Sequence, residues 1–227
     1  MIRVEQELDF ALSLQRRVMK GDVVPAPFQR PYVWNEEDVE NLWQSIVMGL
    51  PIGSVLLWRP PGEITGSRLL GPVRLEPSHR SALVIDGQNR LATLAWSATP
   101  YDRTVDDDSS GLSVWRSGRR LVADTIASRV RFVGPEEDDP WLVPMHVIGE
   151  SLQMHLRRVW DGGDGTLSRV TWLEELEQSL RSARLVVTTI TADEREARIA
   201  YLRIASAGRP MSPEDLDAAI TGAAVHA

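Results

Sequence analysis

The spacing of apolar residues along the chain first predicts several helices. Asn35 is a favourable N-cap for a helix that ends at Leu50 and carries its apolar side chains on one face. Residues 5–19 are interpreted as an amphipathic helix, because Leu8 and Leu12 stand one turn apart. Further helices are predicted over residues 149–160, 166–182 and 193–206, around residues 91–95, and from Ser212 onward.

Short apolar runs bounded by Pro, Gly or charged residues predict strands. They cover residues 54–58, 83–85 and 185–190, with shorter runs at 112–114, 121–123 and 130–133. We therefore expect an α+β fold: a small mixed sheet flanked by helices, with a helical C-terminal part. Residues 1–148 would form the core, and residues 149–227 a helical extension with one returning strand (185–190), packed on the core as one unit.

One strand–turn–helix passage carries candidate chemistry. The apolar run 83–85 ends at Asp86 and Gly87, and helical spacing resumes at Leu91. The first N–H groups of a helix lack intrahelical partners, and a glycine lets a phosphate approach the backbone. Arg90, in the first turn, adds a planar guanidinium suited to phosphate oxygens. The passage predicts an anion site, although an ordinary turn followed by a solvated arginine is also consistent with these residues.

Composition narrows the function classes. The 227 residues hold no cysteine, which excludes disulfides and thiolate metal sites, and no apolar run of about 20 residues that would span a bilayer. The acidic N-terminus lacks a signal-peptide pattern, so a cytoplasmic location is expected. A net charge of −7 argues against nonspecific coating of nucleic acid. The histidines are too widely spaced for a metal pair, and neither a Walker-type loop nor a His-Asn-His motif is present.

Three blocks in a fixed order resemble a known family. They are Gln29-Arg30-Pro31-Tyr32-Val33-Trp34, Ile85-Asp86-Gly87-Gln88-Asn89-Arg90, and the segment from Tyr201 to Ser212, with Pro51-Ile52-Gly53 between the first two. This order resembles the N-terminal domain of GmrSD-type modification-dependent restriction systems, a domain similar to the ParB and sulfiredoxin fold. The resemblance runs from about residue 23 to 217. Asn89 stands where that family usually has Gln, and Ala205 or Ser206 stands where it usually has Asn.

The resemblance implies a nucleotide site. Asp86, Gly87, Gln88, Asn89 and Arg90 would bind the phosphates of an NTP (GTP, ATP or CTP), with Gln29 and Arg30 folded across from them. Asp86 and Arg90 would be catalytic: Asp86 would hold Mg²⁺ or orient a water, and Arg90 would neutralise charge during phosphoryl transfer. A purely structural pairing of Asp86 with Arg90 or Arg30 is the alternative.

Two aromatic residues of the first block are candidates for contact with DNA or a base. Tyr32 lies beside the arginine of the motif and is open to a stacking role or to the core. Trp34 directly precedes the N-cap residue Asn35, a position that favours a hydrophobic staple in the core.

We expect a nucleotide-binding, NTP-hydrolysing sensor or regulatory subunit of a DNA-modification-dependent restriction and phage-defence system. Its partners would be modified DNA and a separate HNH-type nuclease subunit, since position 227 is reached before such a nuclease domain begins. It would have no membrane partner and is a possible homo-oligomer. Two alternatives stay open: a metal-dependent nuclease of ParB-like type using Asp86, and a non-catalytic interaction module.

Overall fold

The computed structural model describes residues 2–29, 32–100, 118–149, 151–159, 162–163 and 165–205. The strands are β1 (Arg3–Phe10), β2 (Val23–Pro25), β3 (Ser54–Arg59), β4 (Arg68–Leu70), β5 (Val73–Leu75), β6 (Ala82–Asp86), β7 (Arg120–Asp124), β8 (Arg129–Val133), β9 (Leu142–Pro144) and β10 (Arg184–Thr191). The helices are α1 (Ala11–Met19), α2 (Glu36–Val47), α3 (Gln88–Ser97), the 3-10 turn η3 (Met145–Val147), α5 (Leu152–Val159), α6 (Thr166–Ser182) and α7 (Glu194–Ala205).

A five-stranded mixed sheet in the order β1-β10-β3-β6-β2 forms the centre of the fold. Strand β10 pairs antiparallel with β1 and parallel with β3, whereas β6 pairs antiparallel with β3 and parallel with β2. The α+β class and the mixed sheet flanked by helices are therefore confirmed. The ParB/sulfiredoxin-like fold and the division at residue 148 stay predictions.

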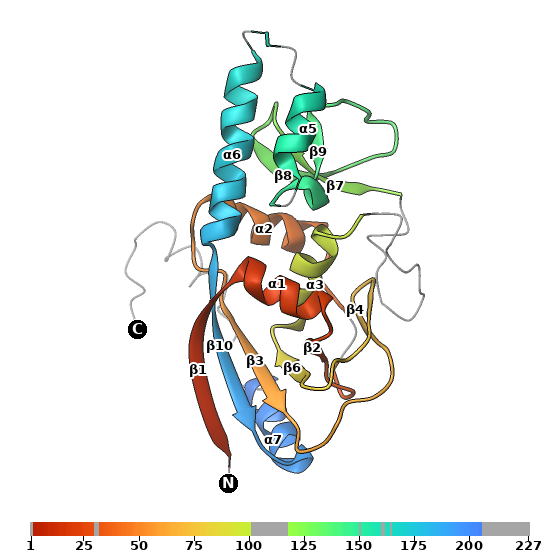
Figure 1. Cartoon of the computed structure of the whole chain (residues 1–227), viewed down its shortest axis with the longest axis vertical. Helices are drawn as coiled ribbons and strands as arrows, with labels where there is room; N and C mark the ends of the chain where they lie inside the picture. Colours follow the sequence, from red (N-terminus) through yellow and green to blue (C-terminus); the bar gives the residue numbers. More distant parts are fainter. Residues whose placement is uncertain are drawn as a thin grey trace, which may run out of the picture.

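Two smaller sheets complete the described structure. Strands β4 and β5 form a hairpin, and β7 pairs antiparallel with both β8 and β9. Figure 1 shows the three-stranded sheet with α5 and α6 at one end of the molecule, and α7 with the tips of β10 and β3 at the other. Buried side chains from both regions join one hydrophobic core. Within the described residues, no helix has the length and apolar character needed to cross a membrane.

The helix expected over residues 5–19 is wrong in its first half. Strand β1 occupies residues 3–10, and α1 begins only at Ala11. Apolar Val4, Leu8 and Phe10 alternate with charged residues, which is the two-residue period of a strand. The four-residue step from Leu8 to Leu12 imitates a helix turn but crosses a strand–helix junction.

Most other predicted elements are confirmed. Helix α6 spans residues 166–182, and Asn35 caps α2 through a capping box in which its side chain accepts a hydrogen bond from the Asp38 backbone N–H. Helix α2 ends at Val47 rather than Leu50. The strand expected at 112–114, the helix from Ser212 and the end of α7 beyond residue 205 lie outside the described residues.

Candidate functional site

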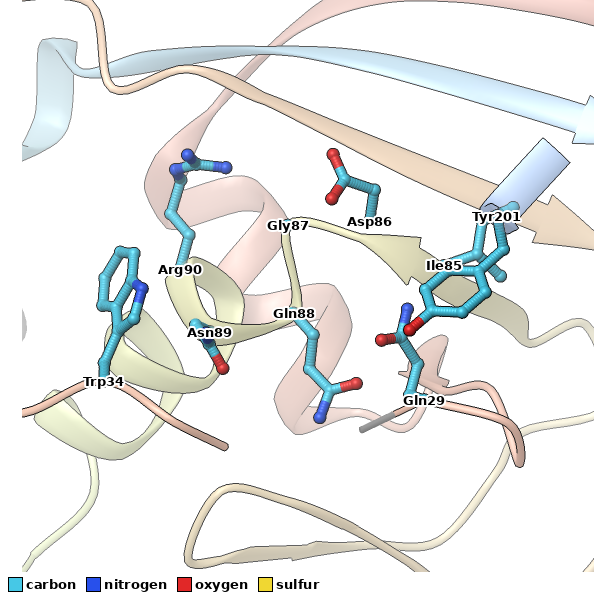
Figure 2. Close-up of a pocket in the computed structure, with 9 residues that line it drawn as sticks. All are labelled: Gln29, Trp34, Ile85, Asp86, Gly87, Gln88, Asn89, Arg90 and Tyr201. Atoms are coloured by element: carbon cyan, nitrogen blue, oxygen red, sulfur yellow. The ribbon is translucent and has the colours of Figure 1, made fainter. Parts of the chain in front are cut away.

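The sequence motifs meet in a pocket beside the end of β6 and the start of α3. The cavity measures about 280 Å³. It is lined by Gln29, Trp34, Ile85, Asp86, Gly87, Gln88, Asn89, Arg90 and Tyr201 (Figure 2). The structure thus brings together Gln29 and residues 86–90, which lie more than fifty positions apart in the sequence. Arg30, the other residue expected here, lies outside the described residues.

Gly87 shapes the backbone at the centre of the pocket. It is the N-cap residue of α3 and adopts a left-handed conformation with φ +83°. A Cβ atom at this position would lie 3.0 Å from the Ser54 carbonyl oxygen and 3.0 Å from Val55 Cγ2. The position therefore favours glycine, which has no side chain to cap the helix. The N-terminal end of α3 opens into the pocket with its positive dipole (Figure 2).

Arg90 is anchored to the start of β3. Its Nη1 donates a 2.7 Å hydrogen bond to the carbonyl oxygen of Ser54. Burial lowers the pKa of Arg90, and the nearby Asp86 carboxylate acts in the opposite direction. No hydrogen bond or ion pair joins the described side chains of Asp86 and Arg90. Asp86 therefore acts on Arg90 through the electrostatic field of its carboxylate, without a direct contact. Its side chain is exposed at the end of β6.

Three carboxamides line the pocket between its charged and aromatic residues. Gln29 donates through Nε2 to the Val84 carbonyl oxygen at 3.3 Å, and Asn89 Oδ1 accepts from the Val33 backbone N–H at 3.4 Å. Asn89 thus connects α3 to the segment that carries Trp34. Gln88 is the most buried of the three.

The two aromatic residues of the first motif lie in different surroundings. Tyr32, predicted to contact DNA or a base, is only 3% exposed and does not line the pocket. Its hydroxyl forms a 2.8 Å hydrogen bond with Thr93 Oγ1, and burial raises its pKa far above the ordinary value. Trp34, which the sequence favours for the core, is half-buried and packs against the hydrophobic core, and it also lines the pocket (Figure 2).

Tyr201 lines the pocket, although its place in the third sequence block does not by itself predict a site residue. It comes from α7, and its ring centroid lies 5.6 Å from that of Phe28, next to Gln29. The signal available in the sequence was an aromatic residue opening the third block of the family pattern.

The pocket offers limited means of holding a metal. Asp86 is the one carboxylate among its described lining residues, and the described part of the chain contains no group of three metal-ligating side chains. Mg²⁺ is commonly held by one or two carboxylates together with substrate phosphates. An exposed carboxylate beside a helix N-terminus therefore fits Mg²⁺ carried by a nucleotide.

Comparison with known proteins establishes the family. The sequence model of the protein family described as "GmrSD restriction endonuclease, N-terminal domain" matches residues 12–221 of this chain. The chain therefore belongs to this family. It is also similar to an uncharacterized protein of Methanocaldococcus jannaschii, with 28% identity over 127 residues. That match covers 52% of this chain and 22% of the relative, so the chain spans about a fifth of the relative's length.

Proposed function

We propose that the pocket binds a nucleoside triphosphate with its phosphates at the N-terminus of α3. The observation that carries the proposal is Gly87, whose left-handed backbone lets a helix N-terminus open into a cavity beside Arg90. Backbone N–H groups and a helix dipole attract anions, and a guanidinium adds a full positive charge. A cavity of about 280 Å³ is close to the lower end of the ligand-site range.

In this proposal the chain also promotes hydrolysis of the bound nucleotide. Arg90, held by Ser54, stabilises the charge that spreads over the phosphoryl oxygens in the transition state. Asp86 orients the attacking water or holds Mg²⁺, which would neutralise charge on the phosphates when bound. Gly87 and the amides of residues 88–90 position the phosphates.

The wider role we propose is that of a sensor or regulatory subunit. Nucleotide binding and hydrolysis would report the presence of modified DNA to a separate HNH-type nuclease. The family assignment supports the restriction context.

The test is a calorimetric titration of the purified protein with GTP, ATP and CTP in Mg²⁺. We expect saturable binding of at least one nucleotide, and a loss of about tenfold or more in affinity for Arg90→Ala, the scale of one charge-assisted hydrogen bond. Arg129→Ala, which removes an exposed arginine of β8, is the matched control and should bind like the unmodified protein. Absence of binding by the folded unmodified protein would refute the proposal.

A further inference from the structure

The pocket has a cationic end at Arg90 and an aromatic end at Tyr201, and the Asp86 carboxylate lies between them (Figure 2). Figure 2 shows Arg90 and Trp34 on one side of Gly87, and Gln29 with Tyr201 on the other. Arg90 and Asp86 are the charged residues among those described that line the cavity. The end at Tyr201 is instead formed by the phenol ring, the apolar side chain of Ile85 and the carboxamide of Gln29.

The ring of Tyr201 packs in a cluster of aromatic rings that are tilted against one another. The Phe28 centroid lies 5.6 Å from the Tyr201 ring and 6.0 Å from the Trp58 ring. The guanidinium carbon of Arg198 lies 4.7 Å from the Phe28 centroid, and Arg198 is itself paired with Glu194 at 2.6 Å. This cluster joins α7 to the loop after β2 and to β3, so Tyr201 reaches the pocket from a supported position.

A hydrogen bond from the same aromatic cluster also holds the start of α7. Trp58 Nε1 donates a 2.9 Å hydrogen bond to the carbonyl oxygen of Ala192, two residues before the helix begins. Ala197, one turn before Tyr201, is fully buried. A side chain on such a helix is more precisely placed than one on a free loop.

The chemistry of this end matches a heteroaromatic ring. Nucleobases stack on aromatic side chains, and a glutamine carboxamide can donate and accept hydrogen bonds along a base edge. Phosphates at the α3 N-terminus and Arg90 would direct the base away from the cation. Trp34 is the other aromatic wall, but it stands beside Arg90, at the end that the phosphates would occupy (Figure 2).

We propose that Tyr201 and Gln29 form the nucleobase subsite of the pocket, with the base stacked on the Tyr201 ring. This inference rests on the proposed nucleotide function and adds the part of the ligand that α7 contacts. It makes α7, which follows β10 near the end of the described chain, a ligand-binding element rather than a packing helix. A nucleotide bound in this way would join β6, α3 and α7 through a single ligand.

The experiment compares a nucleotide with inorganic tripolyphosphate, which carries the phosphates but no base. Both are titrated calorimetrically into the unmodified protein, Tyr201→Ala and Tyr201→Phe. Stacking of one base predicts that Tyr201→Ala weakens nucleotide binding roughly 5- to 150-fold and leaves tripolyphosphate binding unchanged. Tyr201→Phe retains the ring and should bind the nucleotide nearly as the unmodified protein does. Ile199→Ala, an exposed truncation on the same helix, controls for loss of helix stability.

Each outcome has a distinct meaning. If the unmodified protein binds neither ligand, the nucleotide proposal itself fails. If it binds the nucleotide and Tyr201→Ala binds equally well, the phosphate site stands and the base subsite is overturned. Equal losses for nucleotide and tripolyphosphate would assign Tyr201 a structural role and likewise overturn the inference, as would equal affinities of the unmodified protein for the two ligands.

Discussion

The guanidinium of Arg90 rests against Gly53, where a Cβ atom would lie 2.8 Å from its Nη2 atom. The neighbouring Ser54 carbonyl oxygen accepts the 2.7 Å hydrogen bond from Arg90 Nη1. The turn before β3 therefore fixes the arginine of the proposed phosphate site. This contact gives Pro51-Ile52-Gly53, a motif without chemistry of its own, a role in positioning Arg90.

Gly53→Ala should separate backbone strain from displacement of Arg90. Gly53 has φ +89°, so an alanine there costs about 1–2 kcal/mol of stability and also pushes the guanidinium aside. Gly49→Ala is the matched control, because Gly49 has φ +67° but nothing within 4 Å of its added Cβ. We expect similar losses of stability in urea unfolding, with nucleotide affinity lowered about tenfold only for Gly53→Ala. Equal affinities of the two variants would contradict this role.

Elements with one strong local pattern could be predicted from the sequence, whereas the residues of β1 fit both a strand period and a helix step. Helix α6 and strand β10 match their predicted ranges closely, because periodicity and bounding residues define each within its own segment. Strand β1 instead depends on pairing with β10, where Gln6 lies opposite Thr188 at a separation of 182 residues. Residues 5–19 alone carry no information about this distant pairing partner, and the four-residue step from Leu8 to Leu12 favours a helix.

The site was predictable at its centre and unpredictable at its walls. The strand, Gly87 and the helix follow one another directly in the chain, so the turn between strand and helix could be predicted from the sequence. Whether Tyr32 or Trp34 faces the pocket depends on which one reaches Thr93 in α3, a tertiary relationship. Tyr201 enters the pocket only because α7 packs beside β6, which no local pattern indicates.

The buried hydrogen bond of Tyr32 predicts a stability defect without a binding defect. Tyr32→Phe leaves Thr93 Oγ1 without its 2.8 Å partner in the core and should cost about 1–3 kcal/mol. Combining it with Thr93→Val removes both polar groups and should recover part of that loss. Nucleotide affinity, measured on the folded variants, should be unchanged. A large fall in nucleotide affinity for Tyr32→Phe, with stability intact, would restore Tyr32 as a ligand contact.

Asp124 should make the three-stranded sheet sensitive to acid. Burial acts to raise the pKa of its carboxyl, which is 5% exposed, but hydrogen bonds outweigh that effect and lower the pKa below its ordinary value. Oδ1 accepts from the backbone N–H groups of Ile126 and Ala127, both at 2.9 Å, and Oδ2 accepts from Arg131 Nε at 2.6 Å. Arg131 in turn donates to Glu137 Oε2 at 2.8 Å.

A depressed folded-state pKa gives stability that is present above the unfolded-state pKa, about 3.9, and is lost as pH falls through the lower folded value. Asp124→Asn should therefore be less stable than the unmodified protein at pH 7, by roughly 1.5–3 kcal/mol. The difference should shrink as the pH falls below about 4 in urea unfolding experiments. Asp138→Asn, at an exposed position between β8 and β9, should show neither effect. If the difference in unfolding free energy between Asp124→Asn and the unmodified protein stayed constant down to pH 3, ionisation of the carboxyl would be excluded as its cause.

The Asp86 carboxylate should oppose nucleotide binding without Mg²⁺ and favour it with Mg²⁺. Asp86 is exposed at the end of β6 and lines the pocket beside the α3 N-terminus. In EDTA, Asp86→Asn removes a negative charge near the phosphates and should raise nucleotide affinity about fivefold, the scale of roughly 1 kcal/mol for two charges a few ångströms apart in water. With saturating Mg²⁺, Asp86→Asn should bind the nucleotide more weakly than the unmodified protein, because an amide is a weaker Mg²⁺ ligand than a carboxylate. Nucleotide hydrolysis by Asp86→Asn should be lost. Asp138→Asn should follow the unmodified protein under both conditions. If Asp86→Asn binds and hydrolyses nucleotide like the unmodified protein in both buffers, Asp86 neither holds Mg²⁺ nor orients the water, and its contribution is confined to the electrostatic environment of Arg90.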